Sequence, residues 1–224
     1  MNPDEVAQYL QDNPSFFENY ADVLAKIQVS HPHGGQAIAL VDRQMLGLRE
    51  KYRALEAKLA ELLQFGEEND AISEKMHRLS GALLSAPSRH VFFSSLSGSL
   101  KDDFSIPHVA LRLWGVPQRD QDAGRDEFGE VSEELKSYAT ALAEPYCGGN
   151  EKAETAGWFG VPAEQVGSVA HIALREEATA SGGGACVGLL ALGSDDARRF
   201  YSDMGTLYLK RLGDLAGAGL SRFA

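Results

Sequence analysis

The feature that most constrains this chain is a heptad repeat of apolar residues in its first third. The apolar residues recur at alternating steps of three and four. This is the a/d spacing of a coiled coil, and it is narrower than the stripe of a surface helix in a globular protein. Because such a seam is buried against a second helix, we expect a homodimer interface. Its predicted residues are Ile38, Met45, Tyr52 and Leu59 at a, and Val41, Leu48, Leu55 and Leu62 at d.

Charged residues beside this seam favour two parallel helices. Lys51 at a g position and Glu56 at the next e position are spaced to pair between parallel strands of a coiled coil. The alternative is a long helix that packs antiparallel on its own domain. Tyr52, an unusual residue at an a position, leaves that alternative open.

The register of the seam changes after Leu62. Gly66 and Asn69 stand where apolar residues would continue it, and this shift matches a three-residue phase break, which locally overwinds a supercoil. We expect a hinge near Gly66, or the place where the helix joins a domain. A second apolar stripe then follows at Ile72, Met76, Leu79 and Leu83.

Two short helices are predicted before the long one. Pro3 and Pro14 each follow a polar residue suited to cap a helix, and proline is favoured in the first helical turn. Pro32 and the glycines after it then interrupt the chain. The predicted organisation is therefore short N-terminal helices in 1–35, a long dimerising helix in 36–85 and a separate domain in 86–224.

Residues 86–224 combine helix and strand patterns. Period-two alternation predicts a strand in "HVALRLWGV" (108–116), and a glycine-rich link between 167–176 and 184–194 is typical of a hairpin. Helix is expected over 131–147 and again after the last strand, with Ser194 or Asp195 as its N-cap. These patterns predict an α+β domain.

Composition excludes several classes of function. The formal net charge of −11 disfavours contact with a phosphate backbone, so no nucleic-acid partner is expected. No stretch approaches the roughly 20 apolar residues that cross a bilayer, and the first residues lack a signal-peptide pattern. The two cysteines do not form a disulfide framework or a metal-binding set. We expect a cytoplasmic protein without membrane contact or a bound metal.

Three stretches resemble the bacterial proteins of the domain of unknown function 484 family. They are 6–24 ("VAQYLQDNPSFFENYADVL"), 39–70 and 188–212 ("GLLALGSDDARRFYSDMGTLYLKRL"). The resemblance implies a GAF-like domain from about Ala86, with an antiparallel sheet of five or six strands and flanking helices, entered through a signalling-type helix. GAF domains bind small molecules or serve as dimerisation units, and no activity is established for the family as a class.

A ligand pocket in such a domain lies between one sheet face and its covering helices. The candidate ligand-binding residues are Arg112, Trp114, Cys147, Trp158, Phe159 and His171. Each of them has a structural alternative, because a tryptophan under a loop or a half-buried histidine is also an ordinary part of a core. The sequence does not identify a cofactor or ligand.

No catalytic residues are predicted. The histidines stand in unrelated contexts and no Gly-x-Ser-x-Gly elbow occurs. Cys147 stands at the C-terminal end of the helix expected over 131–147, and the dipole at a helix C-terminus disfavours a thiolate. The leading hypothesis is a non-enzymatic homodimer that senses a small molecule or docks a protein partner. The alternatives are a structural adaptor with a self-filled pocket and a thiol-dependent enzyme that uses Cys147.

Overall fold

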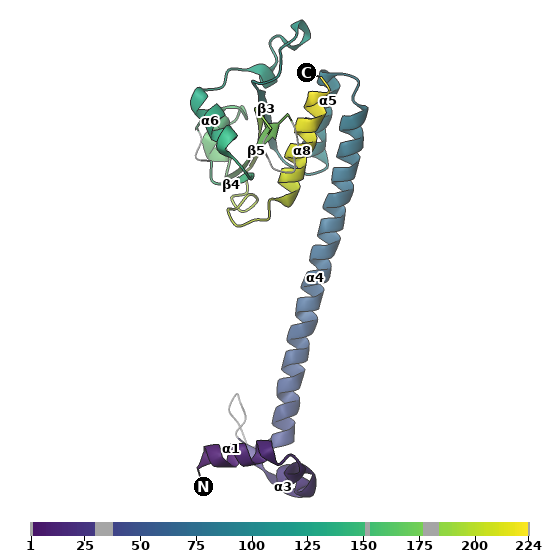
Figure 1. The fold of residues 1–224 in the computed structure, drawn as a ribbon, viewed down its shortest axis with the longest axis vertical. Helices are drawn as coiled ribbons and strands as arrows, with labels where there is room; N and C mark the ends of the chain where they lie inside the picture. Colours follow the sequence, from purple (N-terminus) through teal and green to yellow (C-terminus); the bar gives the residue numbers. More distant parts are fainter. Residues whose placement is uncertain (1, 30–37, 151–152, 177–183, 224) are drawn as a thin grey trace. The chain divides into compact units, whose positions relative to one another are not determined.

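The computed structural model of the chain describes residues 2–29, 38–150, 153–176 and 184–223 (Figure 1). The chain divides into two compact units, Met1–Asn69 and Asp70–Ala224. In the described part of the chain, no helix combines the length and the apolar character that crossing a membrane requires.

The first unit begins with short helices, but the described residues form three where two were predicted: α1 (Pro3–Asp12), α2 (Ser15–Asn19) and α3 (Ala21–Lys26). The start of α1 follows from its sequence, because Pro3 occupies the first turn and the Glu5 carboxylate accepts a hydrogen bond from the Asn2 backbone N–H at 3.0 Å. Two short antiparallel strands follow, β1 (Gln28–Val29) and β2 (Ile38–Ala39).

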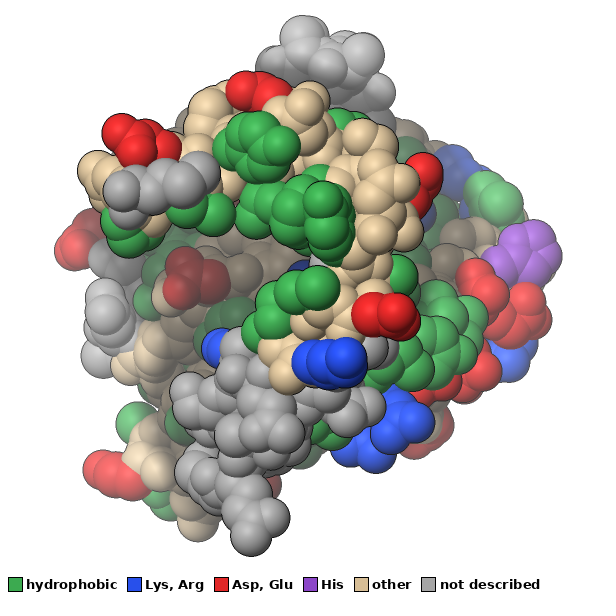
Figure 2. Space-filling view, turned by 90° about the horizontal axis from the view of Figure 1, so that it is seen from below, with side chains coloured by type: hydrophobic (Ala, Val, Ile, Leu, Met, Phe, Trp, Pro, Cys, Tyr) green, Lys and Arg blue, Asp and Glu red, His purple; other side chains and the backbone are tan. Residues whose placement is uncertain are grey.

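The long predicted helix is present as α4 (Leu40–Ser85). Its start differs from the prediction, because Ile38 pairs with Val29 in the β1–β2 ladder and is therefore not a helical seam position. The predicted seam positions from Met45 to Leu62 are on the helix and exposed by 48–67%; they are Met45, Leu48, Tyr52, Leu55, Leu59 and Leu62. Figure 2 shows hydrophobic side chains at the surface among acidic and basic ones.

The second unit is built on a four-stranded antiparallel sheet in the order β3-β6-β5-β4. Its strands are β3 (His108–Leu113), β4 (Tyr146–Gly148), β5 (Ser168–Arg175) and β6 (Cys186–Ser194). The predicted hairpin is confirmed by the antiparallel pairing of β5 with β6. The α+β class is also confirmed, although the described residues give the sheet four strands and not five or six.

Helices cover both faces of the sheet (Figure 1). On one face, α5 (Arg89–Asp102), α8 (Leu207–Ser221) and the last turns of α4 form the main hydrophobic core, with Phe92, Leu83 and Leu220 almost fully buried. On the other face, α6 (Glu133–Ala141) packs Leu135 and Ala139 on Leu189 of β6. Because β6 is central and covered on both sides, it is an almost continuous apolar run.

Two sequence predictions about helix ends are wrong. The last helix, α8, begins at Leu207 and not after Ser194. Residues 195–200 form turns instead, because the Asp196 carboxylate accepts the backbone N–H of Arg198 at 2.9 Å and this local bond competes with helix. The helix expected over 131–147 ends at Ala141, and Cys147 lies in β4.

Candidate functional site

The candidate site lies on the sheet face covered by α6. The strand register places Ala191 of β6 between Ala110 of β3 and His171 of β5, and it places Leu189 between Arg112 and Ala173. Since paired residues share a face of the sheet, Arg112 and His171 face the same side. Small side chains separate them. The register thus joins two of the predicted ligand-binding residues in one layer.

His171 is fully buried between two tyrosines. Its ring stacks on Tyr146 with centroids 5.6 Å apart and meets Tyr138 edge-on at 5.8 Å. The Tyr138 hydroxyl oxygen lies 3.1 Å from Nδ1 of His171, within hydrogen-bond distance. These contacts fix the imidazole in a mostly aromatic environment.

Arg112 lies against Trp158 on the same face. The guanidinium carbon is 5.1 Å from the indole centroid, which is cation–π geometry, and Nη1 donates to the Leu111 carbonyl at 3.0 Å. Partial burial lowers the pKa of Arg112 from its ordinary value, while the charges of Asp126 and Glu127 oppose that shift. Both acids belong to η2 (Asp126–Phe128). Arg112 therefore gives the site a cation with an aromatic neighbour.

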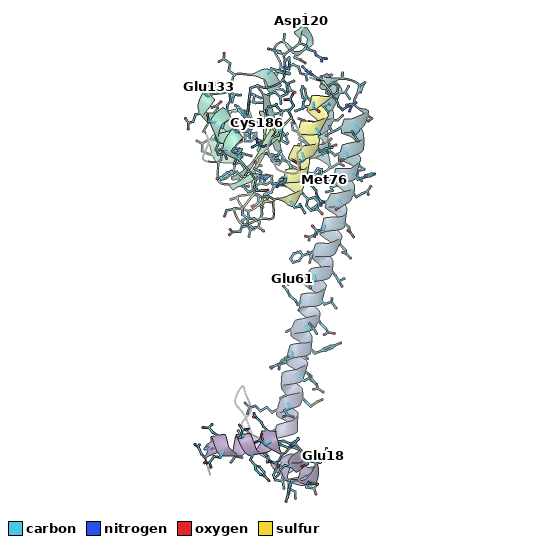
Figure 3. The ribbon with its side chains drawn as sticks, viewed as in Figure 1. Glu18, Glu61, Met76, Asp120, Glu133 and Cys186 are labelled. Atoms are coloured by element: carbon cyan, nitrogen blue, oxygen red, sulfur yellow. The ribbon has the colours of Figure 1, made fainter. Side chains whose placement is uncertain are left out.

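Trp114 belongs to the apolar layer around Arg112. Its indole N–H donates to the carbonyl of Cys186 at 3.0 Å. Its ring packs, as does that of Trp158, against the cluster of Leu135, Ala139 and Leu189. Cys186 is labelled in Figure 3. The indole N–H of this partly buried tryptophan is thus satisfied by the backbone.

Phe159 lies near the end of the sheet, away from this layer. Its ring centroid is 5.8 Å from that of His108, whose Nε2 lies 2.8 Å from Oδ1 of Asp195. A Cβ added to Gly193 would approach Phe159 to 3.1 Å. Phe159 therefore packs over the last residues of β6.

Cys147 faces the opposite side of the sheet. It pairs with Ala170 in the register, one residue from the His171 pair, and it belongs to the main core with 6% exposure. Burial raises the pKa of the Cys147 thiol to about 11 and also raises that of Cys186. Because the thiolate is the reactive form, neither environment favours a nucleophile at neutral pH.

Sequence reasoning did not identify Tyr138 and Tyr146 as site residues. Tyr146 reaches His171 only through the pairing of β4 with β5, and Tyr138 does so from α6. The sequence does show an aromatic residue, Tyr146, next to Cys147. That Tyr146 contacts His171 follows only from the pairing of β4 with β5. Among the described residues, no group of three His, Cys, Asp or Glu side chains is arranged to hold a metal ion.

A family model described as "Protein of unknown function, DUF484" matches residues 1–224. The chain therefore belongs to the DUF484 family, as the three resembling stretches suggested. No curated protein matches the chain.

Proposed function

We propose that this member of the DUF484 family is a non-enzymatic, GAF-like homodimer of the bacterial cytoplasm. Helix α4 joins two copies, and the α+β unit binds a small molecule on its α6 face. The observation that carries the proposal is the exposed apolar seam between Met45 and Leu62.

The seam supports a second copy of the chain as the partner of α4. All described side chains from Lys51 to Asp70 are exposed, so no other described residue buries this part of the helix. Most helical stability in proteins comes from packing of an apolar face, and full burial of one leucine contributes about 1.5–3 kcal/mol. A parallel, in-register dimer buries each seam residue against its own copy and brings Lys51 near Glu56 of the other helix.

The α6 face supports the binding of a planar small molecule. Such sites have mostly apolar and aromatic walls with a few polar groups, and this face offers the Arg112 guanidinium, the Trp158 indole and the buried His171. Ala110, Ala173 and Ala191 are the small residues that lie beside Arg112 and His171 in the strand register.

The contacts of Trp158 and Tyr138 favour a second candidate, a structural adaptor. In this role the side chains themselves fill the α6 face, and the dimer serves only to present a partner-docking surface. Native mass spectrometry of the purified protein, followed by a melting-temperature screen against nucleotides and other planar metabolites, separates the two. A bound mass, or a shift that Arg112→Ala reduces, supports the sensor; the absence of both supports the adaptor.

The dimer is tested by sedimentation velocity at micromolar concentration. We expect the wild-type chain to sediment as a dimer and Leu55→Asp to sediment as a monomer, because a carboxylate in the seam is buried without a partner. Ala57→Asp is the matched control, since position 57 is an f position of the same heptad and faces solvent in a coiled coil. A wild-type monomer, or equal loss of the dimer in both variants, would contradict the proposal.

A further inference from the structure

A cavity of about 250 Å³ lies at the N-terminal end of α5, within the second unit. Three segments line it: residues 87–90, which lead into and begin α5, the loop from Arg119 to Arg125, and Phe223 after α8. Three guanidinium groups and one carboxylate face this space, in a protein whose formal net charge is −11. Positive charge is thus concentrated at this cavity, although the chain as a whole is negatively charged.

Arg89 is the buried member of this group, with 5% exposure. Its Nη1 donates to Oδ2 of Asp122 at 2.9 Å and to the Pro117 carbonyl at 2.7 Å, and its Nη2 donates to the Phe223 carbonyl. Its Nε is buried without a hydrogen-bond partner among the described residues. Asp122 also accepts the backbone N–H of Arg119 at 3.0 Å, so the only carboxylate lining the described cavity is already engaged.

Arg119 and Arg125 add charge that this carboxylate does not balance. Nη2 of Arg119 donates at 2.8 Å to the same Phe223 carbonyl that Arg89 uses, so two cations share one neutral oxygen. Nη1 of Arg125 lies 2.7 Å from Nδ1 of His90, while Glu127 contacts only its Nε, at 3.4 Å. Guanidinium groups retain donors here that fit the planar edge of an oxyanion.

The end of α5 adds a further attraction for an anion. This helix has 14 residues, and the Ser88 side chain caps it by accepting the backbone N–H of Val91 at 3.4 Å. Ser88 also lines the cavity, which places the positive end of the helix dipole beside the arginines. The dipole alone would not define a site; here it coincides with a cavity and a guanidinium cluster.

We propose that this cavity binds the phosphate group of a small molecule. Its volume is below the roughly 300–1,000 Å³ of sites that enclose a drug-sized ligand, so it fits a phosphate group rather than a whole nucleotide. The site is separate from the α6 face and does not depend on the function proposed above.

Isothermal titration calorimetry of the full chain with inorganic phosphate tests this proposal. We expect saturable binding that weakens as chloride is raised, because the attraction is largely electrostatic. Arg125→Gln and Arg119→Gln, both changes of cavity-lining side chains, are each expected to weaken binding about tenfold through loss of a charge-assisted contact. Arg198→Gln is the matched control, because Arg198 is exposed and does not line the cavity.

A second titration with glycerol 3-phosphate distinguishes the two sources of the phosphate group. Tighter binding than inorganic phosphate identifies a phosphomonoester as the ligand, and equal binding identifies the free ion. Circular dichroism of each variant verifies that it is folded, and the phosphate-induced rise in melting temperature gives a second readout at constant ionic strength. The proposal fails if the folded wild-type chain shows no saturable binding, or if Arg125→Gln and Arg198→Gln bind phosphate equally well.

Discussion

Helix α4 carries two apolar stripes with steps of three and four residues, and the two lie in opposite environments. The first stripe runs from Met45 to Leu62, and the second from Ile72 to Leu83. Leu48 and Leu55 of the first stripe are 63% and 67% exposed, whereas Leu79 and Leu83 of the second are almost completely buried. The second stripe belongs to the main core together with residues of α5 and α8. A similar spacing thus occurs in two environments, and among the described residues only the second stripe is covered by other parts of the chain.

Polar contacts follow the same division. Around the second stripe, Ser73 lies 3.0 Å from the Tyr208 hydroxyl, and Nη1 of Arg222 donates to the carbonyls of Leu83 and Leu84. Beside the first stripe, an ion pair joins Lys58 to Glu61 one turn along the same exposed helix (Glu61 is labelled in Figure 3). An exposed pair of this kind stabilises a helix only by a few tenths of a kcal/mol. The contacts described for the first stripe thus lie within α4 itself, and the proposed dimer would supply the missing apolar contacts.

The largest expected effect is in the buried stripe. Leu83→Ala removes a side chain that is 1% exposed, so lost burial and the remaining cavity are expected to lower the free energy of unfolding by about 2–5 kcal/mol. Urea denaturation followed by tryptophan fluorescence measures the change. Leu84→Ala is the control, because that neighbouring leucine is 62% exposed and its truncation is expected to cost less than about 0.5 kcal/mol. Equal losses in the two variants would contradict the burial of Leu83 in the second stripe.

A smaller effect is expected in the exposed stripe, where Tyr52 occupies an a position. In the proposed dimer the Tyr52 hydroxyl lies at a buried seam, and an unpaired buried hydroxyl costs roughly 1–3 kcal/mol. Tyr52→Leu is therefore expected to tighten association about tenfold. Sedimentation equilibrium measures the dissociation constant. Tyr201→Leu, at an exposed tyrosine in the second unit, is expected to leave that constant unchanged. Weaker association of the Tyr52 variant would instead favour a partner other than a second parallel copy.

Patterns over neighbouring residues predicted much of the fold. The spacing from Met45 to Leu83 predicted α4, and the alternation in 108–116 and 167–176 predicted strands that the structure contains. The errors occurred where two local interactions competed. The β1–β2 ladder takes Ile38 out of the helix, and the hydrogen bond from the Arg198 backbone to Asp196 makes a turn where a capped helix was predicted.

The candidate site was less predictable, because its geometry depends on strand register. The sequence named Arg112, Trp114, Trp158 and His171, which the structure brings to the α6 side of the sheet. It also named Cys147, which the alternation of β4 turns to the opposite face. The contact of Tyr146 with His171 links residues from two strands whose pairing the sequence does not encode locally. The same holds for the α5 cavity, which joins three distant segments.

The smallest expected effect tests the phase break between the stripes. A Cβ at Gly66 or at Gly81 would meet no atom within 4 Å, so glycine is not required there by packing. Replacement of either glycine by alanine is therefore expected to stabilise α4 by about 0.5–1 kcal/mol, through helix propensity alone. Thermal unfolding, followed by the helix signal in far-ultraviolet circular dichroism, compares the two variants with the wild-type chain. Equal gains would mean that the break at Gly66 is only a change of register. If Gly81→Ala stabilises α4 and Gly66→Ala does not, the result favours the hinge that the sequence predicts near Gly66.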